Sequence, residues 1–426
     1  MNRREFFSAS FQTAAAVGLA PQGRAQTNER IERSRQAALD VLKPSQKVLE
    51  HGLQLHANSA VVESYGFSPR LSPDGGAVRT AIEAGASDME IEDLLEEMSM
   101  TRCVTDPVER TEYANAWKAS GVTCILQNAG EESQAPTTLI KRLARFTYVT
   151  DMLRDVVTRA ATPDDIVTAK TQNKHCLYFS ANGVPLTQQW VSREDELRYV
   201  GVFFQLGVRM MHVTYNRRNM LGDGCAEPAN AGLSDLGRAA IAEMNRRGVI
   251  VDVAHSGWRT SLEAAKASKR PMVASHSACV SLHNHIRSKP DEVIRAIADT
   301  GGYIGICSVP SFLGRTADLN AMLDHIDYVI KNFGADHAAI GTDLVYSSRT
   351  DSVEWPKIPK RPRSRPRFEY FWPPGALALE SKRAPSLAWI NWPMFTVGMV
   401  QRGHSDADIQ KVLGGNVLRV ARAALA

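Results

Sequence analysis

The stretch from residue 248 to residue 277 constrains the fold more than any other part of the chain. Two apolar, β-branched runs lie here, and each ends in a histidine, His255 and His276. Between them, residues 258–269 carry apolar side chains at helical spacing. A strand, a helix and a second strand in this order form a βαβ unit, whose two strands are parallel. The stretch therefore predicts an α/β fold with both histidines at the C-terminal edge of a parallel sheet.

The same alternation of apolar strands and helical patterns runs along most of the chain. Besides the two strands of residues 248–277, we predict strands at residues 59–62, 122–127, 175–180, 208–213, 303–308 and 338–343. Eight such strands separated by helices predict a (β/α)8 TIM barrel. An open doubly wound sheet is the alternative, but no Gly-x-Gly-x-x-Gly follows a strand, so its dinucleotide-binding version has no support. Two closing helices are expected around residues 389–399 and 406–425.

The N-terminal segment has the features of an export signal. Arg3 and Arg4 precede two phenylalanines, a weakly apolar stretch follows, and small residues before Gln26 offer a cleavage site. This pattern resembles a Tat signal over residues 1–25. We expect the Tat machinery to export the protein to the periplasm. The mature chain, residues 26–426, is expected to form a single domain with an irregular, proline- and arginine-rich excursion at about 345–385.

Charge and cysteine content exclude some partners and leave others open. The net charge is +4 over 426 residues, too small to imply nucleic acid binding. The basic run at residues 357–367 is broken by prolines and is expected to be an exposed loop. The six cysteines show no Cys-x-x-Cys spacing, so buried free thiols are expected, although an oxidising compartment would permit pairing.

Polar side chains follow several predicted strands and are candidates for a site at one rim of the barrel. Two histidines on neighbouring strands are typical of metal ligands. An aspartate can accept a proton, and an arginine can bind a carboxylate with two hydrogen bonds. Structural roles remain the alternatives: Asp343 could cap a loop, Arg287 could form an ion pair with Asp291, and Tyr215 could lie in a solvated loop. The candidates are Asn182, Tyr215, His255, His276, Arg287 and Asp343.

Several phrases, in their order and spacing, resemble the membrane (renal-type) dipeptidase family, peptidase family M19. The resemblance implies an amidohydrolase-like TIM barrel, usually a binuclear zinc hydrolase that cleaves dipeptides. The matching phrases are residues 232–237 (Gly-Leu-Ser-Asp-Leu-Gly), 243–255, 275–277 (Ser-His-Ser), Arg287 with 290–292, 341–343 (Gly-Thr-Asp) and 415–420.

This sequence departs from the family pattern at four positions. Alignment on residues 61–62 places Tyr65 and Phe67 where the family has its first His-x-Asp pair. Asn182 stands at the position of the metal-bridging glutamate, and Tyr215 at that of a substrate-contacting histidine. A neutral amide is a poor bridge between two cations. We therefore expect at most one zinc ion, held by His255 and His276.

The resemblance implies roles for the remaining candidates. Asp343 is expected to be a catalytic general base. Arg287 is expected to act in catalysis and, with Tyr215 and Asn182, in substrate binding. These roles predict a periplasmic metallo-dipeptidase-like hydrolase that cleaves a dipeptide or a related small amide with metal-activated water. The alternatives are a non-hydrolytic tailoring enzyme and a metal-poor binding protein on the same scaffold. A homodimer is left open.

Overall fold

The computed structural model describes residues 28–130, 135–361 and 370–426. The predicted export signal at residues 1–25 and part of the basic run at 357–367 lie outside the described residues. Among the helices that are described, none combines the length and apolar character needed to span a membrane. All six cysteines are free thiols, and five of them are buried.

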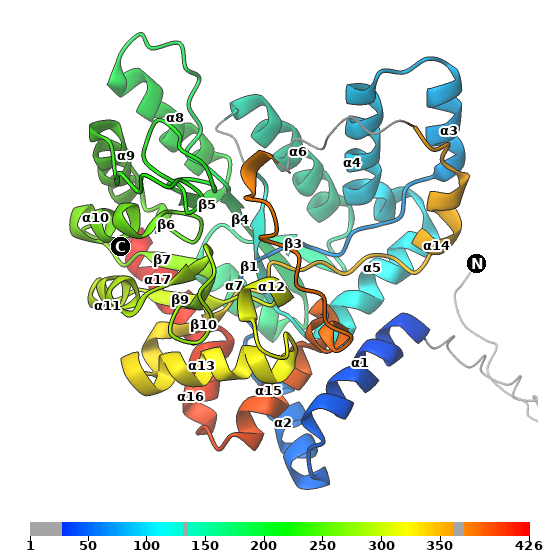
Figure 1. The fold of residues 1–426 in the computed structure, drawn as a ribbon. Helices are drawn as coiled ribbons and strands as arrows, with labels where there is room; N and C mark the ends of the chain where they lie inside the picture. Colours follow the sequence, from blue (N-terminus) through cyan, green and yellow to red (C-terminus); the bar gives the residue numbers. More distant parts are fainter. Residues whose placement is uncertain (1–27, 131–134, 362–369) are drawn as a thin grey trace, which may run out of the picture.

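Parallel strands form the barrel in the order β1-β2-β4-β5-β6-β7-β9-β10, with helices around the outside (Figure 1). Two short strands, β3 and β8, pair with β4 and β7 beside this path. Between β10 and β1 the backbone N–H of Asp343 donates to the carbonyl of Tyr65 at 3.4 Å, which brings the barrel close to closure. This architecture confirms the predicted TIM barrel. The strands are β1 (Val62–Gly66), β2 (Cys124–Asn128), β3 (Val157–Arg159), β4 (His175–Ala181), β5 (Val208–His212), β6 (Ile250–Asp252), β7 (Val273–Cys279), β8 (Ser288–Lys289), β9 (Tyr303–Ile306) and β10 (Ala338–Ile340).

The helices begin and end at ordinary sequence signals. In α9 the hydroxyl of Ser234 accepts from the backbone N–H of Gly237, and Gly248 ends the helix with a φ of 82°. The helices are α1 (Glu29–Leu42), α2 (Gln46–Asn58), α3 (Gly75–Glu83), α4 (Asp88–Thr105), α5 (Pro107–Ser120), α6 (Pro136–Met152), α7 (Pro163–Thr171), α8 (Arg193–Gln205), α9 (Asp235–Arg247), α10 (Trp258–Ala267), α11 (Asp291–Asp299), α12 (Pro310–Leu313), α13 (Leu319–Phe333), α14 (Asp351–Glu354), α15 (Trp392–Gln401), α16 (Asp406–Gln410) and α17 (Asn416–Leu425).

The first strand lies further along the chain than residues 59–62. Helix α2 continues to Asn58, and β1 begins only at Val62. Tyr65 therefore lies within β1 instead of in the loop after it. Similarly, His276 lies within β7, not at its end. Both positions are deeper in the barrel than the sequence indicated.

The barrel interior holds its own apolar cluster, which includes Val62, Tyr178, Met210 and Ile250. A larger cluster fills the space between the strands and the helices. Helix α17 contributes Val417 and neighbouring residues to the interior cluster. The barrel interior is thus a packed core, and only the C-terminal ends of the strands are available to form an active site.

Short elements break up the stretch between β10 and α15. They include α14, the 3-10 helix η2 (Trp355–Lys357) and the 3-10 helix η4 (Ala384–Leu387). The segment that follows residue 369, orange in Figure 1, passes in front of the strands. Trp372 and Leu377 of this segment line the cavity described below, so this irregular stretch forms part of the site.

Candidate functional site

A cavity of about 820 Å³ opens at the C-terminal rim of the barrel. Its size falls within the range of small-molecule sites. Four of the candidates from the sequence line it: Asn182, Tyr215, His255 and Asp343. His276 and Arg287 are fully buried and are not among the lining residues. The structure therefore brings the candidates to one end of the barrel but at two depths.

His255 and His276 face one another across the floor of this cavity. Their Nε2 atoms lie 2.9 Å apart. The Nδ1 atom of His255 lies 2.7 Å from Oδ1 of Asn216, and that of His276 lies 2.8 Å from the hydroxyl of Ser275. Because the Asn216 oxygen can only accept, His255 carries its proton on Nδ1, and its Nε2 accepts from the Nε2–H of His276.

Both histidines are neutral in this environment. Burial lowers the pKa of His255 well below its usual range, and the nearby positive charge of Arg287 adds to the effect. The same two causes, in the same order, lower the pKa of His276. Neutral imidazoles are the form that binds metal ions. The chemistry of this pair is therefore that of two lone-pair donors.

Tyr65 lies directly against His276. The two rings are stacked with centroids 3.8 Å apart and an interplanar angle of 14°. The Tyr65 hydroxyl donates to Oδ1 of Asn182 at 2.7 Å. The register shifts next to Tyr65 in the β1–β2 pair and next to His276 in the β7–β9 pair. Such bulges re-aim side chains, which explains how both rings come to face the same space.

Arg287 is packed beneath the histidines. Its Nη2 donates to the carbonyl of His276 at 2.8 Å, and its guanidinium lies 5.1 Å from the ring centroid of Phe312. Nη1 is buried and has no hydrogen-bond partner among the described residues. In this position Arg287 braces the β7 backbone. The predicted contact between Arg287 and substrate remains a prediction.

Asp343 occupies an unusual backbone conformation at the end of β10. Its φ is 56°, a left-handed value that few residues other than glycine adopt. The residue is half-buried and lines the cavity. Strained backbone of this kind is concentrated at functional sites. Its position is consistent with the predicted role as general base.

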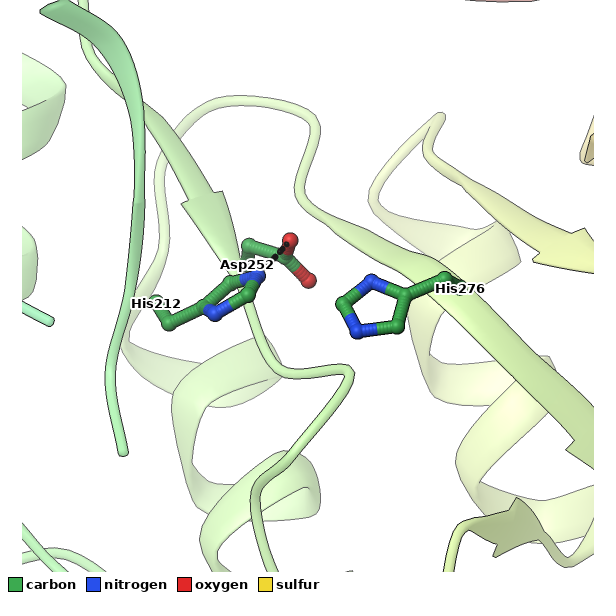
Figure 2. Close-up of side chains that lie close together, drawn as sticks. All are labelled: His212, Asp252 and His276. Carbon is green, nitrogen blue, oxygen red and sulfur yellow. Dashed lines mark ion pairs between the residues drawn. The ribbon is translucent and has the colours of Figure 1, made fainter. Parts of the chain in front are cut away.

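Two further polar residues lie below the rim. The sequence did not point to His212, and it left open whether Asp252 faces the barrel or orients a ligand. His212 ends β5 and Asp252 ends β6, and both side chains are fully buried. His212 Nε2 lies 2.6 Å from Asp252 Oδ2 (Figure 2). His212 was missed because its strand is buried on both faces. Such a strand shows no alternation of polar and apolar residues, so the sequence does not indicate which side chains point into the barrel.

The residues at the family's metal positions do not fit a binuclear zinc centre. Such a centre needs carboxylates to offset two divalent charges. The resemblance aligns Tyr65 and Phe67 with the first ligand pair, and in the structure Asn182 supplies an amide oxygen already bonded to Tyr65. The Tyr65 ring, stacked on His276, also fills space next to that imidazole. We therefore derive no catalytic step through a pair of zinc ions.

The fold places the chain in the class of TIM barrels with a polar cavity at the C-terminal rim. Residues 99–354, more than half of the 426-residue chain, match the family described as Membrane dipeptidase (Peptidase family M19). The chain belongs to this family, which confirms the resemblance drawn from the sequence.

Individual relatives share this fold at low sequence identity. An amidohydrolase from Pseudomonas aeruginosa has a TM-score of 0.63 and 24% identity, covering 88% of this chain and 99% of that one. The probable dipeptidase PvdM from the same organism has a TM-score of 0.62 and 20% identity, covering 89% and 99%. Dipeptidase tcpJ from Claviceps purpurea is 26% identical over 279 residues, 64% of this chain and 57% of the fungal protein. The chain thus spans about half the length of the curated relatives it matches.

Proposed function

We propose that the protein hydrolyses a dipeptide or a related small amide bound in the rim cavity. Membership of a dipeptidase family and a cavity of about 820 Å³ support this proposal. The observation that carries it is that Asp343 and His255 line the same cavity. Asp343 would accept the proton of the attacking water, and His255 would form part of the cavity wall beside that water.

Arg70 gives the cavity a positive charge suited to the carboxylate of such a substrate. Its guanidinium lies 5.6 Å from the ring centroid of Phe67. Arg70 lines the cavity. Its backbone N–H donates to the carbonyl of Tyr346, but its guanidinium donates no hydrogen bond to residues 28–130, 135–361 or 370–426. An arginine with unused donors can bind a carboxylate with two hydrogen bonds. We assign it the C-terminal carboxylate of the dipeptide.

A dipeptide panel tests this proposal with liberated amino acids as the readout. Arg70→Met should raise KM for a cleaved dipeptide by about 10- to 100-fold, since a charged hydrogen bond contributes about 1.5–3 kcal/mol. The C-terminal amide of the same dipeptide is the matched control, and its KM should change little. Arg70→Lys should restore part of the loss. Equal effects on acid and amide would contradict the role of Arg70, and no cleavage of any dipeptide would contradict hydrolysis.

A non-hydrolytic role on the same scaffold is the second candidate. It is favoured by the stacking of Tyr65 on His276, because this ring replaces a metal-ligand position of the family. A peptide-derived ligand would then bind in the cavity without being cleaved. Calorimetric binding of dipeptides with no release of amino acids over many hours would favour this candidate, whereas turnover would exclude it.

We propose further that the chain is exported to the periplasm by the Tat machinery. The paired Arg3 and Arg4 before two phenylalanines support this. Replacing both by lysine (Arg3→Lys with Arg4→Lys) should retain the full-length protein in the cytoplasm. Cell fractionation and immunoblotting measure the result. Periplasmic accumulation of the double variant at the wild-type level would contradict the Tat route.

A further inference from the structure

The upper layer of the barrel interior is polar. Met210 and Ile250 belong to the interior apolar cluster. His212 follows Met210 by two residues, and Asp252 follows Ile250 by two residues, so each lies on the same face of its strand. His212 and Asp252 are also direct register partners of β5 and β6. Barrel interiors are ordinarily filled by branched aliphatic side chains. A fully buried histidine and aspartate at this level therefore require a specific explanation.

The space around the two residues is lined by small side chains. The inward positions that follow the interior cluster by two residues on other strands are Ser64, Ser180, Ser275, Gly305 and Gly341. An added Cβ at Gly305 or Gly341 would lie within 2.1 Å of the carbonyl oxygen of Ser275. The strands thus approach one another closely at this level. The large side chains in this layer are those of His212, Asp252, Tyr65 and His276.

The hydrogen bonds of this layer leave ligand atoms unused. Oδ1 of Asp252 accepts from the backbone N–H groups of Ala254 and Ser275 at 2.9 and 3.1 Å, which fixes the carboxylate. Oδ2 faces His212 Nε2 at 2.6 Å, but the angles do not make a hydrogen bond. Both ring nitrogens of His212 and Oδ2 of Asp252 make no hydrogen bond to the described residues, and the ion-pair contact between Nε2 and Oδ2 leaves Nδ1 of His212 without any polar contact. Such buried atoms each cost about 1–3 kcal/mol unless something else satisfies them.

His276 completes the set from the opposite side. Figure 2 shows its ring facing the His212–Asp252 pair, and one ligand atom from each residue lies within 4.8 Å of the others. Two imidazoles and one carboxylate are a common three-ligand set for a divalent zinc ion. A single carboxylate leaves one net positive charge, which suits one ion and not two.

We propose that His212, Asp252 and His276 bind one divalent cation of the zinc type, one layer below the position between His255 and His276. In this arrangement His255 is not a ligand. On tetrahedral zinc the ligand atoms of His212 and Asp252 would lie roughly 3.4 Å apart, given bonds of about 2.0–2.2 Å. They are now 2.6 Å apart, so the two side chains would have to separate to admit the ion. The backbone donors to Asp252 Oδ1 already provide the outer support typical of metal ligands.

Metal titration of the full-length protein tests the site directly. After chelation and dialysis, cobalt is added as a spectroscopic probe, and zinc per chain is measured by elemental analysis. The wild type should bind one equivalent. His212→Gln and Asp252→Asn should each weaken binding by at least about 100-fold. The matched control, His255→Gln, should bind within a few-fold of wild type, because that ring lies outside the proposed set.

The metal titration does not depend on dipeptide cleavage, because metal binding is measured without a substrate. Circular dichroism and thermal unfolding of each variant identify any that fail to fold. For that case, anomalous diffraction from cobalt-loaded wild type locates the ion without a substitution. An ion bonded to His212 and Asp252 supports the proposal. No binding by the wild type, or an ion between His255 and His276 that is lost in His255→Gln and kept in His212→Gln, would overturn it.

Discussion

Asp343→Asn is expected to lower kcat for dipeptide hydrolysis by about 10²- to 10⁴-fold, the usual contribution of a general base. Asparagine has nearly the same shape but cannot accept the proton of the attacking water. KM should change little, because Arg70 and the rest of the cavity are intact. Steady-state kinetics on the best substrate of the dipeptide panel measure both constants.

The control for this variant concerns its backbone. Asp343 has a left-handed φ of 56°, which asparagine tolerates about as well as aspartate. The thermal unfolding temperature of Asp343→Asn should therefore match the wild type. A folded variant that retains wild-type kcat would exclude Asp343 as the base, and it would also show that cleavage depends on another residue of the cavity.

The barrel could be predicted from sequence because its strands are short apolar runs between amphipathic helices. The strands predicted at 122–127, 175–180 and 208–213 correspond to β2, β4 and β5. The helices before residue 175 were predicted less completely. Helices α2, α5 and α7 were not expected there, although Ser45, Asp106 and Thr162 cap them with side-chain hydrogen bonds. Their apolar residues are few, so capping was the only clear signal.

The site could be predicted only as far as its position at the rim. His255 was visible because it follows an apolar strand and precedes a helix. The depth of Tyr65 and His276 was not visible, since register shifts in β1–β2 and β7–β9 turn them inward. The pairing of His212 with Asp252 depends on the register of β5 against β6. Sequence periodicity does not encode register between strands that are buried on both faces.

Trp389 provides a buried contact between the C-terminal part of the chain and the first strand. Its side chain is 1% exposed and packs edge-on against Trp117, with ring centroids 5.5 Å apart. Its Nε1–H donates to Oε2 of Glu63 in β1 at 2.6 Å. The other oxygen of Glu63 accepts from the backbone N–H and the hydroxyl of Thr342. Burial raises the pKa of Glu63 to about 8, so the carboxyl group depends on these donors.

Trp389→Ala is therefore expected to lower the free energy of unfolding by about 3–5 kcal/mol, the usual cost of removing a buried indole. The variant also leaves one oxygen of Glu63 without its donor. Trp389→Phe is the matched control: it keeps most of the apolar contact and loses only the N–H, at a cost of about 1–3 kcal/mol. Urea denaturation followed by circular dichroism measures both. If Trp389→Ala were no less stable than Trp389→Phe, packing of the indole against Trp117 would not contribute to stability.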